Sequence, residues 1–506
     1  MEVVNTRHEA AAVHMADAWA RTTRQIGVAF VTGGPGLTNA VTGIATAHLA
    51  GSPVLVIAGQ SPMANEDRGG LQEIPQLEIV REITKWSRVV RDPARVREYL
   101  DSAICRSLEG HPGPVFLAIP VEVFKSGSHS RVIAAPPSPV RLPGAGGEEV
   151  IQVAELISAA ARPVLIAGSD AHWAHAEEAL HAFVAKTGMP TFTIDLARGL
   201  VADRVAGMFG YADPALNPAA KAIADADLVL LVGHNLDFRT QFGALVSAHA
   251  RVVELVVDQF QHGRNRTPDL ALLCDLPSTL RALTRALGAP SPAHGAWASE
   301  LRAARARGEA SWKETARREP ASSIHPLDIC EALGPWLDDD TCIVLDGGDF
   351  VQWPRAFLSA GGPGQWLRLG PMSTLGAGLP FANAVQLARP ESRVILLTGD
   401  GGFGFYGFEL HTTGLLGLPI KVVMGNDGLW GTERRFQTVA YGAERIFGIE
   451  VGGFPYDKYA QLFGAWGAQV SERSELGTAL EELMRHEGPG LLNVSIVSAG
   501  QPSDQR

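Results

Sequence analysis

Two polar residues that follow consecutive apolar runs carry the clearest chemistry in this sequence. Asp400 follows the run 393–399, and Asn426 follows the run 419–425. Both runs read as buried parallel strands, so both side chains should lie at the carboxyl edge of one sheet, where open α/β sheets bind ligands. A carboxylate and an amide oxygen suit Mg²⁺, and the carbonyl of Gly428 could supply a third ligand. The pattern therefore indicates a magnesium site.

The glycines around Asp400 suit a phosphate group. Gly399, Gly401 and Gly402 let the backbone approach an anion closely, and the helix-like segment that follows offers unpaired N–H groups. Taken singly, Asp400 is more often part of a tight turn, and Asn426 more often just ends a strand. Their joint pattern, with 24 residues between Gly401 and Asn426, is far more specific than either residue alone.

The elements that must position these residues form an α/β pattern. Short apolar runs alternate with longer alanine-rich, helix-like stretches, and the runs are continuous because both faces of a parallel sheet are covered by helices. They are 27–32, 53–59, 114–119, 163–168, 227–233, 252–258, 341–346, 393–399, 419–425 and 490–497. We therefore predict three doubly wound α/β domains with mainly parallel sheets.

Two stretches rich in Pro, Gly and Ser or Ala divide the chain. Residues 126–147 and 287–295 read as linkers, and a polar helical stretch follows the second one to about residue 320. The predicted domains are 1–128, 148–288 and 320–500.

Composition narrows the classes of partner. A net charge of −11 without a long basic run argues against nucleic acid or an anionic membrane as a main partner. Four scattered cysteines suggest neither a zinc site nor a disulfide framework. The polar start lacks a signal-peptide core, and no apolar run reaches the ~18 residues of a membrane span. These features predict a cytoplasmic protein that acts on a small molecule.

The Gly-Asp-Gly and Asn pattern closely resembles the signature of thiamine-diphosphate enzymes. The segment 7–21, RHEAAAVHMADAWAR, is similar to the one that carries the cofactor-activating glutamate in acetolactate synthases and their relatives. On pattern alone, Glu9 is a first-turn acid favoured by the helix dipole. The resemblance implies more: Glu9 would hydrogen-bond the aminopyrimidine ring, which then removes the proton from the thiazolium C2 carbon. In this family the first domain starts about forty residues earlier, so we expect its sheet to lack an opening strand and helix here.

Further segments extend the resemblance through the chain. Residues 32–39, TGGPGLTN, look like the family's glycine-rich active-site loop, which includes Gly34, and residues 71–73 resemble a stretch whose glutamine, here Gln72, lines the active site. The resemblance implies catalytic roles for Glu9, Gln72 and Glu433. It implies that the cofactor is bound by Gly34, Gly348, Asp349, Phe350, Leu375, Gly401, Gly402 and Trp430.

Leu375 and the residues after the metal loop bear on cofactor shape and substrate. In the family, a bulky apolar residue at the place of Leu375 wedges beneath the cofactor and forces its V shape. Thr432 and Phe436 stand where acetolactate synthases carry Met and Trp. The run Trp-Gly-x-Glu that ends at Glu433 instead resembles actinobacterial 2-hydroxyacyl-CoA lyases, in which the glutamate acts on the substrate hydroxyl. Glu433 could equally be a solvent-facing helix charge.

The favoured function is cleavage of a 2-hydroxyacyl-CoA into a carbonyl compound and formyl-CoA. An acetolactate synthase-like reaction on 2-oxo acids is the main alternative, and oxalyl-CoA-type decarboxylation is a lesser one. The lyases usually extend further as a C-terminal cover over CoA, whereas this sequence ends at Arg506. A cofactor-binding non-catalytic homologue and an NAD(P) oxidoreductase are the other classes; the second lacks a dinucleotide fingerprint.

The middle domain and the assembly are predicted from the resemblance. Some relatives bind FAD or an ADP or CoA moiety in the central domain. Arg198 or Arg239 could meet such a phosphate, although an ordinary salt bridge is the favoured interpretation for each. In the family the pyrimidine-binding domain of one subunit faces the diphosphate-binding domain of another, which implies a homodimer or a homotetramer.

Overall fold

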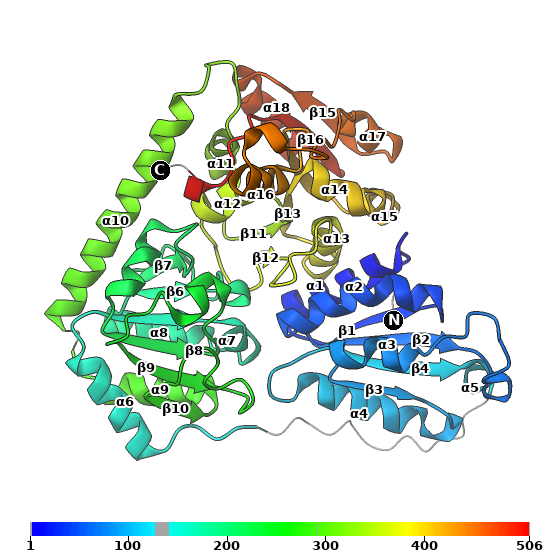
Figure 1. Ribbon diagram of the computed structural model, residues 1–506, viewed down its shortest axis with the longest axis horizontal. Coiled ribbons are helices and arrows are strands. Elements are labelled where there is room, and N and C mark those ends of the chain that lie inside the picture. The colour runs from blue at the N-terminus through cyan, green and yellow to red at the C-terminus, as the bar shows by residue number, and fades with distance from the viewer. Residues whose placement is uncertain (1–2, 127–140, 290, 505–506) are drawn as a thin grey trace.

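Three α/β lobes lie around a common centre in the computed structural model, which describes residues 3–126, 141–289 and 291–504 (Figure 1). Each lobe contains one sheet, and all registered strand pairs are parallel. The prediction of three α/β units with parallel sheets is confirmed. The proposed linker 126–147 lies largely outside the described residues, and the domain boundaries stay a prediction.

The first lobe has four strands in the order β1-β2-β4-β3. The strands are β1 (Gly27–Val31), β2 (Val54–Gln60), β3 (Trp86–Val89) and β4 (Val115–Pro120). Its helices are α1 (Glu9–Thr23), α2 (Pro35–Ala50), α3 (Gln76–Val80), α4 (Val96–Leu108) and α5 (Val121–Lys125).

The second lobe has six strands in the order β10-β9-β8-β5-β6-β7. They are β5 (Pro163–Ala167), β6 (Thr191–Thr193), β7 (Met208–Tyr211), β8 (Leu228–Val232), β9 (Arg251–Val256) and β10 (Leu270–Leu273). Its helices are α6 (Gly147–Ala159), α7 (Ser169–Trp173), α8 (Glu177–Thr187) and α9 (Leu276–Ala286).

The third lobe has six strands in the order β12-β11-β13-β14-β16-β15. They are β11 (Thr341–Leu345), β12 (Trp366–Arg368), β13 (Arg393–Gly399), β14 (Lys421–Asn426), β15 (Trp466–Val470) and β16 (Gly490–Ser495). Its helices are α11 (Pro326–Leu333), α12 (Gln352–Phe357), α13 (Gly378–Ala388), α14 (Asp400–Tyr406), α15 (Leu410–Leu415), α16 (Gly431–Tyr441), α17 (Tyr456–Leu462) and α18 (Arg473–Arg485).

A long helix, α10 (Pro292–Arg317), runs along one side of the molecule between the second and third lobes (Figure 1). It starts inside the predicted linker 287–295. Ser291 caps it by accepting a hydrogen bond from the Ala293 backbone N–H, and Pro292 occupies the first turn, where a missing N–H costs nothing. The Pro and Ser residues that suggested a linker therefore begin a helix. In the described part of the chain, no helix is both long and apolar enough to cross a membrane.

Helix α1 joins the first lobe to the third. Asp17 and Arg21 form a buried ion pair on α1, and the Arg21 Nη1 atom donates to the backbone oxygen of Arg368 at 2.7 Å. At the start of α1, the Arg7 and His8 backbone N–H groups donate to Glu409 Oε1 at 2.8 and 3.0 Å. These charge-assisted contacts fix the end of strand β12 and the beginning of α1.

Candidate functional site

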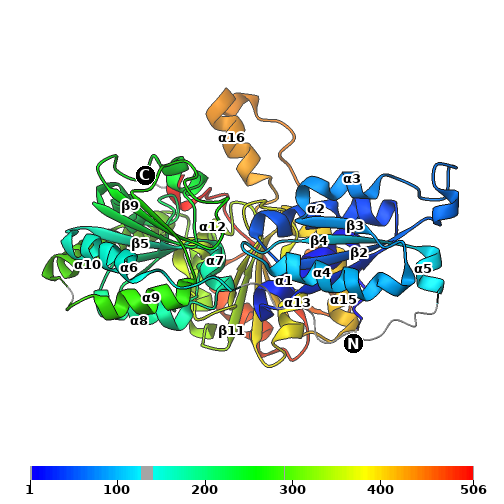
Figure 2. The ribbon, with the colours of Figure 1, turned by 90° about the horizontal axis from the view of Figure 1, so that it is seen from below.

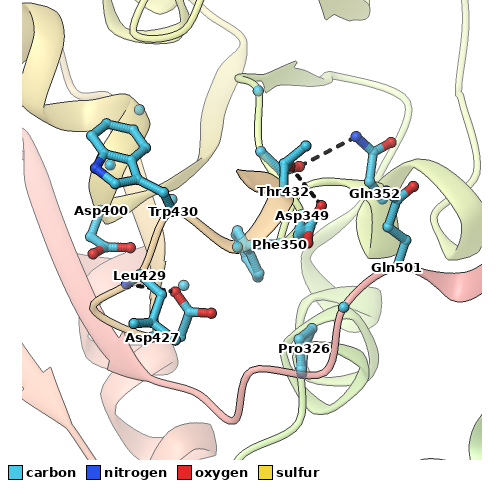
Figure 3. A pocket seen from close by; sticks show the side chains of 18 of the residues that line it. Pro326, Asp349, Phe350, Gln352, Asp400, Asp427, Leu429, Trp430, Thr432 and Gln501 are labelled. Atoms are coloured by element: carbon cyan, nitrogen blue, oxygen red, sulfur yellow. Dashed lines mark hydrogen bonds between the residues drawn. The ribbon is translucent and has the colours of Figure 1, made fainter. Parts of the chain in front are cut away.

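A cavity of about 320 Å³ opens at the carboxyl edge of the third sheet (Figure 3). Its walls come from the ends of five neighbouring strands and the segments that follow them. The wall segments lie within 347–352, after β11; 368–375, from the end of β12; 399–402, after β13; 425–435, after β14; and 496–501, after β16. The topology thus gathers residues that are far apart in the sequence, from Gly347 to Gln501.

Several glycines line the floor of this cavity. Gly401 lies against the Trp430 ring, and a Cβ added there would come within 2.7 Å of the ring. Gly348 has a φ of 93°, a left-handed conformation that favours glycine, and a Cβ there would meet no atom within 4 Å. Because glycine has no side chain, the backbone at these positions could be approached closely by an anion such as a diphosphate.

Asp400 is buried at the start of α14, and its Oδ2 atom has no hydrogen-bond partner among the described residues. Burial first, and the nearby charge of Asp427 second, raise the pKa of Asp400 to about 6. Burial also raises the pKa of Asp427. Two carboxyl groups that are difficult to ionise beside each other suit a cation, which would favour the charged form of both.

Asn426 is held at the end of β14. Its Nδ2 atom donates to Asn493 Oδ1 at 3.0 Å, and its Oδ1 atom accepts from the Gly428 backbone N–H at 3.1 Å. Gly428 has a φ of 67°. Within the part of the chain that the structure describes, no three acidic, histidine or cysteine side chains form a metal cluster. The expected ligands, one carboxylate with an amide and a carbonyl oxygen, would not form such a cluster, and they fit a hard cation such as Mg²⁺.

Asp349 anchors helix α16, which follows the loop after β14. Its Oδ1 atom accepts from Thr432 Oγ1 at 2.7 Å, and Arg435 lies 3.8 Å away (Figure 3). Phe350 packs against Gly425, and Leu375 packs against Gly347, so both apolar side chains shape the cavity floor. The structure therefore brings together Gly348, Asp349, Phe350, Leu375, Asp400, Gly401, Gly402 and Trp430 as lining residues, with Asn426 and Gly428 beside them.

Glu433 lines the mouth of the cavity on the first turn of α16. This helix stands away from the body of the molecule and contains no buried residue (Figure 2). Its side chains include Phe436, Val439 and Tyr441, which are 62, 83 and 61% exposed. Glu433 is itself exposed, so its position suits both a group that meets the substrate and a surface charge.

Glu9, Gly34 and Gln72 do not line this cavity. They lie together in the first lobe: Glu9 Oε2 accepts from Asn39 Nδ2 at 2.9 Å, and a Cβ on Gly34 would meet the backbone oxygen of Gln72 at 2.7 Å. Gln72 has a φ of 60°, an uncommon conformation for a residue with a side chain. Within one chain, the residues predicted to activate the cofactor and those predicted to bind it thus form two separate groups.

The two arginines of the second lobe are already paired. Arg198 forms a buried ion pair with Asp203, and Arg239 lies 2.5 Å from both Asp195 and Asp237. Both guanidinium groups therefore behave as structural ion pairs, in line with the favoured interpretation of each. The FAD, ADP or CoA moiety that some relatives bind in this lobe gains no support from them.

Sequence reasoning missed several lining residues. Asp427 follows Asn426 directly and could have been found from that position. Arg368 ends a strand of only three residues, which leaves no periodic pattern. Gln352, Arg435 and Gln501 also line the cavity, and no local sequence pattern indicates this position for them.

Comparisons with known proteins agree with this architecture. Three family models match: the N-terminal TPP binding domain of thiamine pyrophosphate enzymes over residues 1–79, their central domain over 150–283 and their C-terminal TPP binding domain over 346–494. The chain is 31% identical to a probable acetolactate synthase of Mycobacterium bovis, over 98% of this chain and 88% of that one. It is 32% and 31% identical to 2-hydroxyacyl-CoA lyase 2 of Bos taurus and Homo sapiens, each over 94% of this chain and 80% of the other.

The glycine floor yields a matched pair of variants. Gly401→Ala places a methyl group against the Trp430 ring, and overpacking of about 1–3 kcal/mol should weaken thiamine diphosphate binding roughly 10- to 100-fold. Gly404→Ala lies on the same helix and adds a methyl group that meets nothing within 4 Å, so it should leave affinity unchanged. Calorimetric titration with Mg²⁺ present measures both. Equal affinities of the two variants for thiamine diphosphate would show that the cofactor does not bind at this floor.

Proposed function

Because the chain belongs to the thiamine pyrophosphate enzyme family, we propose that it is a Mg²⁺-dependent enzyme that makes or breaks carbon–carbon bonds in this cavity. When bound, thiamine diphosphate supplies a carbon nucleophile that adds to a carbonyl and takes up the electron pair of the breaking bond. The observation that supports this placement is the buried oxygen of Asp400, which has no hydrogen-bond partner among the described residues and lies beside the glycines that line the cavity.

Asp400, Asn426 and the carbonyl of Gly428 would hold the cation, with Asp427 adding negative charge from close by. The cation would neutralise the diphosphate, whose approach to two carboxylates is otherwise unfavourable. Gly348, Gly401 and Gly402 line the cavity, and their lack of side chains would let the diphosphate approach the backbone; Leu375 would support the bend of the cofactor from below.

The proposed cation site predicts a large loss of affinity for thiamine diphosphate when the charge of Asp400 is removed. Asp400→Asn keeps the size of the side chain and removes its charge, so Mg²⁺-dependent affinity for thiamine diphosphate should fall at least about 100-fold, since changes in the outer shell of a metal site alone cost 10- to 100-fold. Calorimetry at several Mg²⁺ concentrations measures this. Asp339→Asn, an exposed change outside the cavity, is the control. Unchanged affinity in Asp400→Asn would refute the cation site.

The activating group is supplied by a second copy of the chain in our proposal. Glu9, Gly34 and Gln72 lie outside the cavity of their own chain, and their resemblance to the family's active-site residues implies that they face the cavity of a partner. The exposed apolar side chains of α16, beside the cavity mouth, support an association surface there. We infer a homodimer or a dimer of dimers. In this arrangement Glu9 holds the proton that passes to and from the aminopyrimidine ring.

Glu9→Gln should keep cofactor affinity but slow exchange of the cofactor's C2 proton by about 100-fold or more, the usual size of a lost acid–base contribution. Deuterium exchange followed by acid quench and NMR measures the rate, with Glu78→Gln, an exposed change in the same lobe, as the control.

Mixing Glu9→Gln with Asp400→Asn protein then tests the two-copy site. A mixed dimer has one site with both changes and one site with neither, so activity should reappear on mixing two inactive proteins. A wild-type exchange rate in Glu9→Gln would rule out the activating role, and no recovery on mixing would rule out the shared site.

We infer that the reaction is 2-hydroxyacyl-CoA cleavage, which gives a carbonyl compound and formyl-CoA. Glu433 supports this choice, because it stands at the cavity mouth where it could accept the proton of the substrate hydroxyl. Acetolactate formation from 2-oxo acids is the second candidate, favoured by a largely buried cation, Arg368, in the cavity wall. We propose that the reaction takes place in the cytoplasm.

A product screen with 2-hydroxyacyl-CoA, oxalyl-CoA and pyruvate separates these reactions. Formyl-CoA from the first substrate is expected, and Glu433→Gln should lower the turnover number about 100-fold or more without changing cofactor affinity. Glu444→Gln, an exposed change after the same helix, should have no effect. Acetolactate as the sole product would establish the second candidate, and full turnover in Glu433→Gln would leave Glu433 as a surface charge.

A further inference from the structure

Arg368 is the last residue of edge strand β12, and it lines the same cavity as Asp400. Its side chain is only 13% exposed, and the nearest carboxylate oxygen, Asp195 Oδ1, lies 4.0 Å from Nη1. An arginine is protonated at neutral pH, so the wall carries a nearly buried positive charge. Nothing in the proposed handling of the cofactor by Asp400, Glu9 or Glu433 uses this charge.

The neighbouring carboxylates are largely committed to other arginines. Asp195 lies 2.5 Å from Arg239, much closer than it lies to Arg368. Asp237 also pairs with Arg239, and Asp203 pairs with Arg198. His234 adds no positive charge at neutral pH, because burial lowers its pKa to about 4.

Arg355, from helix α12, increases the excess of positive charge. It is buried, its Nη1 atom donates to Gln352 Oε1 at 2.5 Å, and its Nε atom has no hydrogen-bond partner in the described residues. The ring of Tyr211 lies 4.9 Å from its guanidinium carbon and offsets part of its charge. The four guanidinium groups of Arg198, Arg239, Arg355 and Arg368 thus face three carboxylates.

Burial first, and the charge of Arg355 second, lower the pKa of Arg368 to about 9. A lowered value for an arginine means that the surroundings do not compensate its charge, and such a buried charge is costly unless a ligand pairs with it. The backbone at Arg368 is fixed, because Arg21 donates a hydrogen bond of 2.7 Å to its carbonyl oxygen. A fixed, uncompensated guanidinium in a cavity wall has the features of an anion-binding group.

The cavity is therefore polarised. Asp400 and Asp427 make one end acidic, and this end suits the cation, while Arg368 makes another part of the wall basic. A substrate anion would be repelled from the first and held at the second.

We propose that Arg368 binds an oxyanion of the substrate, either the carboxylate of a 2-oxo acid or a phosphate of a coenzyme A thioester, and so orients the substrate in the cavity. The inference rests on the proposed function, because the substrate must share this cavity with the cofactor. Arg368 then determines specificity for an anionic substrate over a neutral one of the same shape.

Binding measurements on the protein before cofactor is added test this inference separately from the proposed function. Pyruvate and its neutral methyl ester form one pair of probes, and coenzyme A and pantetheine, which lacks the phosphates, form the other. The wild-type protein should bind the anionic member of at least one pair more tightly. Arg368→Gln should weaken that binding about 10- to 100-fold, the usual size of a lost charge-assisted hydrogen bond, and should leave the neutral member unchanged. Arg368→Lys should retain part of the preference, and Arg204→Gln, an exposed change, should retain all of it.

Kinetics on the holoenzyme provide a second readout. Arg368→Gln should raise KM for the anionic substrate about 10-fold or more and change kcat little, with thiamine diphosphate affinity as in the wild type. Loss of preference within the pyruvate pair identifies the carboxylate, and loss within the coenzyme A pair identifies the phosphate.

Three results would overturn the inference: equal binding of both members of both pairs by the wild-type protein, an unchanged preference in Arg368→Gln, or weakened cofactor binding with unchanged substrate binding. The protein could bind anions through Arg368 and yet fail to bind thiamine diphosphate. That result would refute the proposed function and support the inference.

Discussion

The third sheet places a carboxylate, Asp400, where the described chain offers it no cation. The register of β13 and β14 pairs Gly399 with Gly425, so Asp400 and Asn426 leave the sheet at the same level on adjacent strands. Burial of an unpaired carboxylate is unfavourable by several kcal/mol, and the chain meets this cost through a raised pKa. A bound divalent cation would reverse that preference. Binding of such a cation and its phosphate ligand would explain three features together. These are the glycine floor, the nearby Asp427 and the fixed Asn426 side chain.

How much of the fold the sequence predicts depends on where each strand lies in its sheet. The ten continuous apolar runs are all strands in the structure, and nine of them are interior strands covered on both faces. The strands that sequence reasoning missed are mostly edges: β3, β7, β10, β12 and β15 each end a sheet. An edge strand has one neighbour and less need for a continuous apolar run. The sixth missed strand, β6, is interior but has only three residues, too few for a pattern.

The same distinction explains which parts of the candidate site were predictable. Asp400 and Asn426 follow interior strands that are consecutive in the chain, so their spacing alone placed them together. Arg368 ends an edge strand and meets the cavity through the sheet order β12-β11-β13, which no local pattern specifies. The partner of an ion pair is equally hidden: a salt bridge was the favoured interpretation for Arg239, but no local pattern identified Asp195, 44 positions earlier and 2.5 Å away, as its partner. The roles of Glu9 and Gln72 depend on assembly of two chains, because the cavity that they are proposed to face belongs to another copy.

Glu433 and Arg368 constrain the substrate in different ways. Glu433 stands at the mouth, on a helix held to the floor by the hydrogen bond from Thr432 to Asp349, so it can meet a group that enters from outside. Arg368 lies within the wall of a cavity of about 320 Å³ and is held there by Arg21. In a 2-oxo acid the carboxylate is bonded directly to the reacting carbonyl carbon, so both can fit inside the cavity at once. In a coenzyme A thioester the phosphates are separated from the carbonyl by the pantetheine arm, which would have to fold back along the wall to reach the same guanidinium. Arg368 therefore matches a compact carboxylate substrate more directly, whereas Glu433 matches a substrate whose hydroxyl lies at the mouth.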